Sequence, residues 1–131
     1  MDSRSNSSRD SALEPSPDQS LIDNHGRPIN YLRLAITDRC NLRCRYCMPE
    51  EGVESIKHDQ ALSYEELERL VRLFQGLGVN KVRITGGEPF VRRGCLEFMK
   101  ALKRRLGIEQ LYLTTNGVET YRYIDRLKEI D

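Results

Sequence analysis

From residue 29 onward the chain alternates strand patterns with amphipathic helix patterns, in the order strand, loop, helix, three times over. The predicted strands span 31–37, 81–85 and 111–115, and the predicted helices span 63–75, 95–106 and 119 to the end. Ser63 and Glu66 form a capping box at the start of the first helix. Because repeated β-loop-α units place their strands side by side in one sheet, this alternation predicts an α/β fold with a parallel sheet.

The predicted strands alternate apolar and polar residues and are not apolar throughout. Their polar positions include Arg33, Lys81, Arg83 and Thr114. A flat sheet covered on both faces would bury these charges without partners, at a severe cost in free energy. A curved sheet around a lumen filled with solvent or ligand would not. We therefore predict three β-α units of a partial, TIM-like barrel with a basic interior and a ligand at the carboxyl ends of the strands.

The N-terminal segment differs in composition from the rest of the chain. Seven of the first twenty residues are serine, and large apolar residues are almost absent there. Such a stretch buries too little surface to offset its ordering entropy, so residues 1–20 are predicted to form a disordered tail. The net charge of +1 gives no reason to expect nucleic acid or a membrane as partner. Without a visible signal peptide or an apolar run of ~20 residues, a cytoplasmic location is expected.

Three of the four cysteines lie in a C-x3-C-x2-C loop directly after the first predicted strand. Cys40, Cys44 and Cys47 would supply three of the four ligands of a cubane iron–sulfur cluster. The alternatives are a zinc site, for which His58 is a poorly spaced fourth ligand, and three inert buried thiols. The fourth cysteine, Cys95, follows the apolar stripe of its predicted helix, which indicates core packing.

Two motifs together resemble the radical S-adenosylmethionine (SAM) superfamily. The first is the cysteine loop with Tyr46 inside it, and the second is Gly-Gly-Glu-Pro at residues 86–89, directly after the second strand. The finer resemblance is to the molybdenum cofactor biosynthesis protein A family, GTP 3′,8-cyclase, and it covers residues 21–131. It is carried by residues 31–34, 37–44, 46–50, 81–89, 91–93 and 113–117. One departure is Leu42, where many relatives have Phe.

This resemblance implies a [4Fe-4S] cluster on the three loop cysteines and SAM as cosubstrate on its fourth iron. In the family the reduced cluster supplies the electron that cleaves SAM. Tyr46 and Gly87 are then expected to contact SAM, because a glycine lets the backbone approach the methionine ammonium closely. An ordinary strand-ending turn would also explain the two glycines, and shielding of the cluster would also explain the tyrosine.

By the same resemblance, Arg33, Arg83 and Thr114 would contact GTP. Guanidinium groups bind phosphate oxygens well, although a solvated charge or an ion pair with Glu88 or Asp38 is the alternative for each arginine. The implied reaction converts GTP to (8S)-3′,8-cyclo-7,8-dihydroguanosine 5′-triphosphate in molybdopterin biosynthesis. The implied partners are an unidentified electron donor and the downstream cyclic pyranopterin monophosphate synthase, and a homodimer is compatible with this interpretation.

Complete members of the family have six β-α units in a (β/α)6 partial barrel, and a second three-cysteine motif for a second [4Fe-4S] cluster. We therefore expect residues 21–131 to be the N-terminal part of a radical SAM domain, and the chain to be a fragment with little or no cyclase activity alone. Two other functions stay open on the sequence. One is a radical SAM enzyme acting on a peptide or another substrate, and the other is a non-enzymatic iron–sulfur or zinc-binding module.

Overall fold

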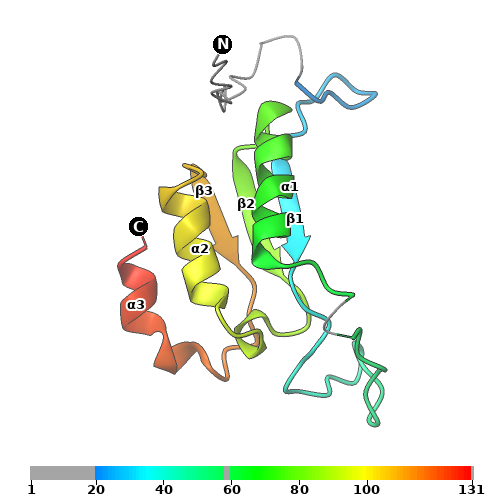
Figure 1. Ribbon diagram of the computed structural model, residues 1–131. Coiled ribbons are helices and arrows are strands. Elements are labelled where there is room, and N and C mark those ends of the chain that lie inside the picture. The colour runs from blue at the N-terminus through cyan, green and yellow to red at the C-terminus, as the bar shows by residue number, and fades with distance from the viewer. Residues whose placement is uncertain (1–19, 58–59, 131) are drawn as a thin grey trace, which may run out of the picture.

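Three parallel strands with helices packed on them form the fold in the computed structural model, which describes residues 20–57 and 60–130 (Figure 1). In chain order the elements are β1 (Tyr31–Ala35), α1 (Tyr64–Gly76), β2 (Lys81–Thr85), the 3-10 turn η1 (Pro89–Val91), α2 (Cys95–Arg104), β3 (Gln110–Leu113), the 3-10 turn η2 (Thr120–Arg122) and α3 (Ile124–Lys128). The parallel strand order β1-β2-β3 confirms the predicted α/β class. The predicted tail, residues 1–20, lies outside the described residues apart from Ser20.

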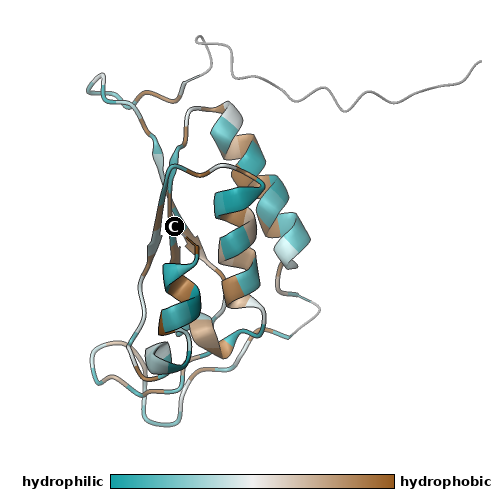
Figure 2. Cartoon of the chain, turned by 90° about the vertical axis from the view of Figure 1, so that its left-hand side faces the viewer, coloured by the Kyte–Doolittle hydropathy of each residue, from teal (hydrophilic) through white to brown (hydrophobic). Residues whose placement is uncertain are grey.

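Helices α1 and α2 lie on the same face of the sheet, with apolar residues turned toward the strands (Figures 1 and 2). The alternation within each strand explains this layering. In β2, Val82 and Ile84 are fully buried, whereas Lys81, Arg83 and Thr85 between them are only partly buried. No helix of the described residues covers the opposite, polar face of the sheet (Figure 2). The period-2 pattern therefore predicted correctly which strand residues face the helices.

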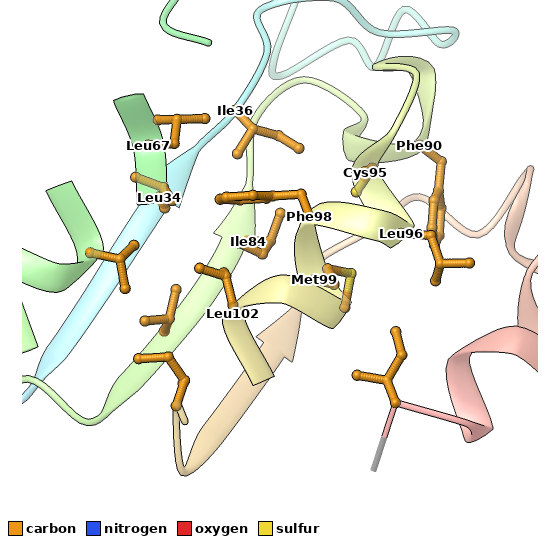
Figure 3. Close-up of a cluster of buried hydrophobic side chains, with 14 of the residues drawn as sticks. Leu34, Ile36, Leu67, Ile84, Phe90, Cys95, Leu96, Phe98, Met99 and Leu102 are labelled. Carbon is orange, nitrogen blue, oxygen red and sulfur yellow. The ribbon is translucent and has the colours of Figure 1, made fainter. Parts of the chain in front are cut away.

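The core lies between the sheet and the two longer helices (Figure 3). Strand residues such as Leu34 and Ile84 meet Leu67 of α1 and Leu102 of α2 there. Cys95, at the start of α2, is 3% exposed and belongs to this cluster, as predicted. Burying such side chains fully contributes about 1.5–3 kcal/mol each, so this single layer of contacts holds the helices on the sheet.

The capping box at the start of α1 is confirmed. The Ser63 hydroxyl accepts a hydrogen bond from the Glu66 backbone N–H at 3.2 Å, and the Glu66 carboxylate accepts one from the Ser63 N–H at 2.7 Å. These bonds satisfy backbone donors that a helix leaves unpaired at its start. Helix α1 therefore begins at a fixed point, directly after the long loop that carries the cysteines.

Two strands end earlier than predicted, because backbone groups at their carboxyl ends bind other partners. Strand β1 stops at Ala35, and the Thr37 carbonyl accepts a hydrogen bond from the Gly87 N–H at 2.8 Å. Strand β3 starts at Gln110 and stops at Leu113, and the Asn116 N–H donates to the Glu88 carboxylate at 2.7 Å. Both departures lie at the edge of the sheet where the motifs meet.

The continuous third helix predicted from residue 119 is wrong. The segment forms η2 and then the short α3, and neither has a side-chain cap at its start. Tyr123, between the two, stacks on Phe90 with ring centroids 4.5 Å apart. This stacking contact and the missing cap explain why the helical pattern of the sequence breaks here. Similarly, α2 ends at Arg104, two residues before the predicted end.

None of the helices in the described part of the chain combines the length and the apolar character that a membrane span requires.

Candidate active site

The three predicted cysteine ligands lie on the long loop between β1 and α1, at the carboxyl end of the sheet (Figure 1). The thiols are free, with Cys40 and Cys44 partly buried and Cys47 exposed. The Cys47 and Met48 N–H groups both donate to the Cys44 carbonyl, at 2.9 and 3.0 Å, so the second half of the motif forms a turn. The Arg43 guanidinium folds back and donates to the Cys40 carbonyl at 3.0 Å.

The donor set of this loop fits an iron–sulfur cluster. It offers three free thiols within eight residues, and thiolate sulfur is the ligand that such clusters use. Among residues 20–57 and 60–130, no three His, Cys, Asp or Glu side chains are gathered closely enough to hold a single metal ion. The structure thus places the three thiols on one loop without bringing them together. His58, the weak candidate for a fourth zinc ligand, lies outside the described residues.

Cys95 differs from the loop cysteines in its electrostatic environment. Burial, together with the nearby Glu88 and Glu97 carboxylates, raises the pKa of its thiol to about 12. A thiol with so high a pKa stays protonated at neutral pH and is a poor metal ligand. The structure therefore separates one structural cysteine from the three candidate ligands.

The Gly-Gly-Glu-Pro turn after β2 is bound directly to the start of the cysteine loop. The Gly87 N–H donates to the Thr37 carbonyl, and the Glu88 N–H donates to the Arg39 carbonyl, each at 2.8 Å. A Cβ atom added at Gly87 would lie 2.1 Å from the Arg39 carbonyl oxygen, which is far inside van der Waals contact. The close approach predicted for Gly87 is therefore used, at least in part, by the protein's own backbone.

Glu88 of this turn, which the sequence analysis named only as a possible ion-pair partner of an arginine, is a connecting residue of the site. It is fully buried, and its carboxylate accepts hydrogen bonds from the Thr115 hydroxyl at 2.6 Å, the Asn116 N–H at 2.7 Å and the Phe90 N–H at 3.3 Å. It therefore joins the end of β2 to the segment after β3. The signal was in the sequence, because an acidic residue and a Thr-Asn pair follow neighbouring parallel strands.

Asn116 carries this connection on to the cysteine loop. Its amide nitrogen lies 3.9 Å from the Cys40 sulfur and donates to the Asn41 side-chain oxygen at 2.7 Å. Its amide oxygen accepts from the Val118 N–H at 3.0 Å, which fixes the orientation of the amide. The first candidate ligand, Cys40, is thus bordered by the ends of β2 and β3.

Tyr46, predicted to contact SAM, lies on the turn between Cys44 and Cys47. Its side chain is 95% exposed, which makes it the most exposed of the large hydrophobic residues in the described part of the chain. The structure therefore places Tyr46 beside the candidate ligands with its ring free for an added group.

The three predicted GTP contacts share the uncovered face of the sheet. Arg33 of β1 and Arg83 of β2 are paired in register, and the Arg83 guanidinium donates to the Thr114 hydroxyl at 3.1 Å. Arg83 also donates to the Tyr31 hydroxyl and lies 4.9 Å above the Tyr112 ring. The two tyrosines, which the sequence analysis left unassigned, therefore hold Arg83 in place on this face.

Comparison with known proteins agrees with this arrangement. A family model described as the radical SAM superfamily matches residues 34–131. The chain is 57% identical over 98 residues to the GTP 3′,8-cyclase of Geobacter sulfurreducens, which covers 75% of this chain and 30% of that protein. It is 49% identical over 108 residues to that of Heliobacterium modesticaldum, covering 82% and 33%, and 50% identical over 109 residues to that of Alkaliphilus oremlandii, covering 83% and 34%.

The chain spans about a third of the length of these curated relatives. The family model, in contrast, covers three quarters of the chain and includes the cysteine loop, the Gly-Gly-Glu-Pro turn and the segment after β3. Membership implies a [4Fe-4S] cluster and SAM as cofactors. The chain belongs to the radical SAM superfamily.

Proposed function

We propose that this chain carries the cluster site, the SAM site and the first GTP contacts of a GTP 3′,8-cyclase. The observation that carries the proposal is the attachment of the cysteine loop to the Gly86-Gly87 turn, at the carboxyl end of the sheet that also bears the Arg83–Thr114 pair. Parallel α/β folds place ligands at this end of their strands. Relatives at 49–57% identity that are named GTP 3′,8-cyclase support the choice of reaction.

In this proposal Cys40, Cys44 and Cys47 hold a [4Fe-4S] cluster, which supplies an electron for the reductive cleavage of SAM. Three protein ligands leave one iron for the cosubstrate to chelate. Tyr46 and the backbone at Gly87 would hold SAM, and the exposed ring of Tyr46 is free to pack on it. The Glu88 N–H binds the turn to the loop at the Arg39 carbonyl, and the Glu88 carboxylate binds the turn to the segment after β3.

Arg33, Arg83 and Thr114 bind GTP on the uncovered face of the sheet. A guanidinium has five N–H donors, and Arg83 uses two of them on Tyr31 and Thr114. The remaining donors suit phosphate oxygens, and the neighbouring Arg33 adds a second positive charge. Thr114 and Tyr31 orient Arg83 so that its plane is fixed before a nucleotide binds.

The polar, uncovered face supports a larger architecture, in which these three units are the first part of a (β/α)6 partial barrel. The reaction would convert GTP to (8S)-3′,8-cyclo-7,8-dihydroguanosine 5′-triphosphate, which a cyclic pyranopterin monophosphate synthase would consume in molybdopterin biosynthesis. An external electron donor is required, and a homodimer is compatible with the proposal. Clustered free thiols suit a reducing compartment such as the cytoplasm.

Anaerobic reconstitution with iron and sulfide tests the cluster. We expect about four iron ions per chain and, after reduction, an electron paramagnetic resonance (EPR) signal that changes when SAM is added. The triple variant Cys40→Ser, Cys44→Ser, Cys47→Ser should lose this iron. Cys95→Val is the control and should keep it, because valine removes the fourth thiol but stays apolar in the core. Zinc instead of iron, or equal iron in the triple variant, would contradict the proposal.

Equilibrium binding of GTP to the reconstituted chain tests the nucleotide site. Arg83→Ala should weaken GTP binding about tenfold, the loss expected for one charge-assisted contact to phosphate. Arg72→Ala is the matched control, because Arg72 is an exposed arginine on α1, in the opposite layer of the fold. Equal losses in the two variants would indicate a nonspecific charge effect and contradict the assignment.

A further inference from the structure

Glu88 is a buried carboxylate without an ionic partner. It is fully buried, and none of the ion pairs among the described residues includes it. A buried charge of this kind is costly unless hydrogen bonds satisfy it. Two of its three donors, Thr115 and Asn116, come from the segment after β3. The hydrogen bonds that offset the cost of burying Glu88 therefore also join the ends of two strands.

Asn116 is held from two directions. Its backbone N–H donates to Glu88, and its side-chain oxygen accepts from the Val118 N–H. These bonds fix both the position of the residue and the orientation of its amide group. The two N–H bonds of the amide nitrogen then point to Cys40 Sγ at 3.9 Å and to Asn41 Oδ1 at 2.7 Å. A donor at 3.9 Å from sulfur is within range for an N–H···S hydrogen bond, because sulfur is a large acceptor.

We propose that Asn116 donates a hydrogen bond to the sulfur of the cluster ligand Cys40, and that Glu88 is a positioning residue that aims this donor. The inference rests on the proposed function, because it requires that Cys40 bind the cluster. It deepens that function by assigning a tuning role to two residues that bind neither the iron nor the substrate in the proposed site.

The physical effect of such a bond has a definite sign. A hydrogen-bond donor at a ligating sulfur stabilises the more negative, reduced cluster and so raises its reduction potential. Loss of the donor should make the cluster harder to reduce without removing any iron ligand. A residue with a merely structural role would not shift the potential in a chain that binds iron normally.

The variant closest in shape is Asn116→Asp. It keeps a side-chain oxygen to accept from Val118, but it replaces the amide donor by a carboxylate oxygen. Asn116→Leu removes the donor without adding charge. Gln110→Glu is the matched control, because Gln110 is exposed at the start of β3, at the opposite end of the sheet, and accepts from the Tyr112 hydroxyl through an oxygen that glutamate keeps. It adds the same charge to the chain away from the cysteine loop.

The measurement is the midpoint potential of the reconstituted cluster in the full chain, by anaerobic titration followed with EPR. We expect Asn116→Leu to lower the potential, Asn116→Asp to lower it further, and Gln110→Glu to leave it unchanged, all with wild-type iron content. Glu88→Gln also removes a negative charge, which by itself raises the potential in either background. Because Glu88 acts through Asn116, we expect this rise to be smaller in the wild-type background, where the donor is also misplaced, than when Asn116 is already Leu.

The outcomes separate this inference from the function on which it rests. A wild-type chain that binds no iron through the three loop cysteines would overturn the proposed function and this inference together. Normal iron content with unchanged potentials in both Asn116 variants would overturn the inference alone. Effects of Glu88→Gln and Asn116→Leu that simply add would overturn the positioning role of Glu88.

Discussion

Gly87 is a residue whose side-chain space is filled by neighbouring backbone. A Cβ atom there would lie 2.1 Å from the Arg39 carbonyl oxygen and 2.9 Å from that of Asp38. Gly87→Ala should therefore push the cysteine loop off the turn, break the 2.8 Å hydrogen bonds at Thr37 and Arg39, and cost about 1–3 kcal/mol of unfolding free energy. Denaturant unfolding measures this loss, and the iron content after reconstitution should fall as well.

The control for this substitution is Gly76→Ala. Apart from its chain neighbours and the backbone of its own helix, no atom lies within 4 Å of a Cβ built at Gly76, the last residue of α1. Alanine there should keep or slightly raise the stability, because it restricts the unfolded chain. If both variants were as stable as the wild type, the packing of the turn against the loop would differ from the one described.

The buried thiol of Cys95 makes stability depend on pH in the alkaline range. Its pKa rises from 9.0 to about 12 in the folded chain, chiefly through burial. A group whose pKa is higher in the folded state stabilises the fold fully below its unfolded pKa, and this contribution is lost as pH rises. The unfolding free energy should therefore fall between pH 9 and 12, by up to about 1.4 kcal/mol per pH unit from this group.

Denaturant unfolding of wild type and Cys95→Val across this range checks the assignment. Valine has a similar size and does not titrate, so the variant should show a shallower decline with pH. A residual decline is expected from Tyr64, because burial also raises the pKa of that phenol. Identical slopes in the two proteins would contradict the role assigned to Cys95.

At the scale of elements, one arginine side chain forms hydrogen bonds to both ends of the cysteine loop. The Arg92 guanidinium, just after η1, donates to the Ile36 carbonyl and to the Leu62 carbonyl, each at 2.6 Å, and lies 4.2 Å from the Tyr64 ring centre. The segment between Ile36 and Leu62 contains all three candidate ligands. Arg92 thus holds the two ends of the loop together.

Lysine cannot reproduce both hydrogen bonds, because it has one ammonium group in place of the planar guanidinium, whose several N–H donors point in different directions. Arg92→Lys should lower the unfolding free energy by about 1–3 kcal/mol and speed amide hydrogen exchange across residues 37–57. Exposed Arg93, the next residue, provides the control Arg93→Lys, which should change neither quantity. Unaltered exchange in the loop of Arg92→Lys would show that the loop is held by other contacts.

The sequence predicted the bounds of an element well where a few consecutive residues determine them. The bounds of β2 and the capping box of α1 agree with the structure, since alternation and capping are visible in a few consecutive residues. The ends of β1 and β3 and the break at Tyr123 were not predicted. Hydrogen bonds to Gly87 and Glu88 accompany the early ends of the two strands, and stacking on Phe90 accompanies the break at Tyr123. These partners are distant in sequence, so local patterns do not reveal them.

At the scale of the whole molecule, the sequence predicted that the motifs share one end of the sheet, but not how they are connected there. The cysteine loop, the glycine turn and Thr114 do lie at one end of a parallel sheet, because strand order follows from β-loop-α repetition. The links made by Glu88, Asn116 and Tyr31 were not predicted. Each depends on side-chain register between neighbouring strands, which a single sequence does not display.

The one-sided layering of the fold leads to the last prediction, which concerns turnover by residues 1–131 alone. Helices α1 and α2 cover one face of the sheet, and Arg33, Arg83 and Thr114 lie on the face that no described helix covers (Figure 2). A nucleotide held there is contacted from one side and stays open to water, whereas a reaction of this class needs an enclosed site.

We expect the reduced, reconstituted chain to yield no cyclised nucleotide from GTP and SAM in an anaerobic assay followed by mass spectrometry. Cleavage of SAM, measured as 5′-deoxyadenosine, is the internal control, because it requires only the proposed cluster and SAM sites. Steady formation of cyclised product would show that these residues enclose their substrate without further chain.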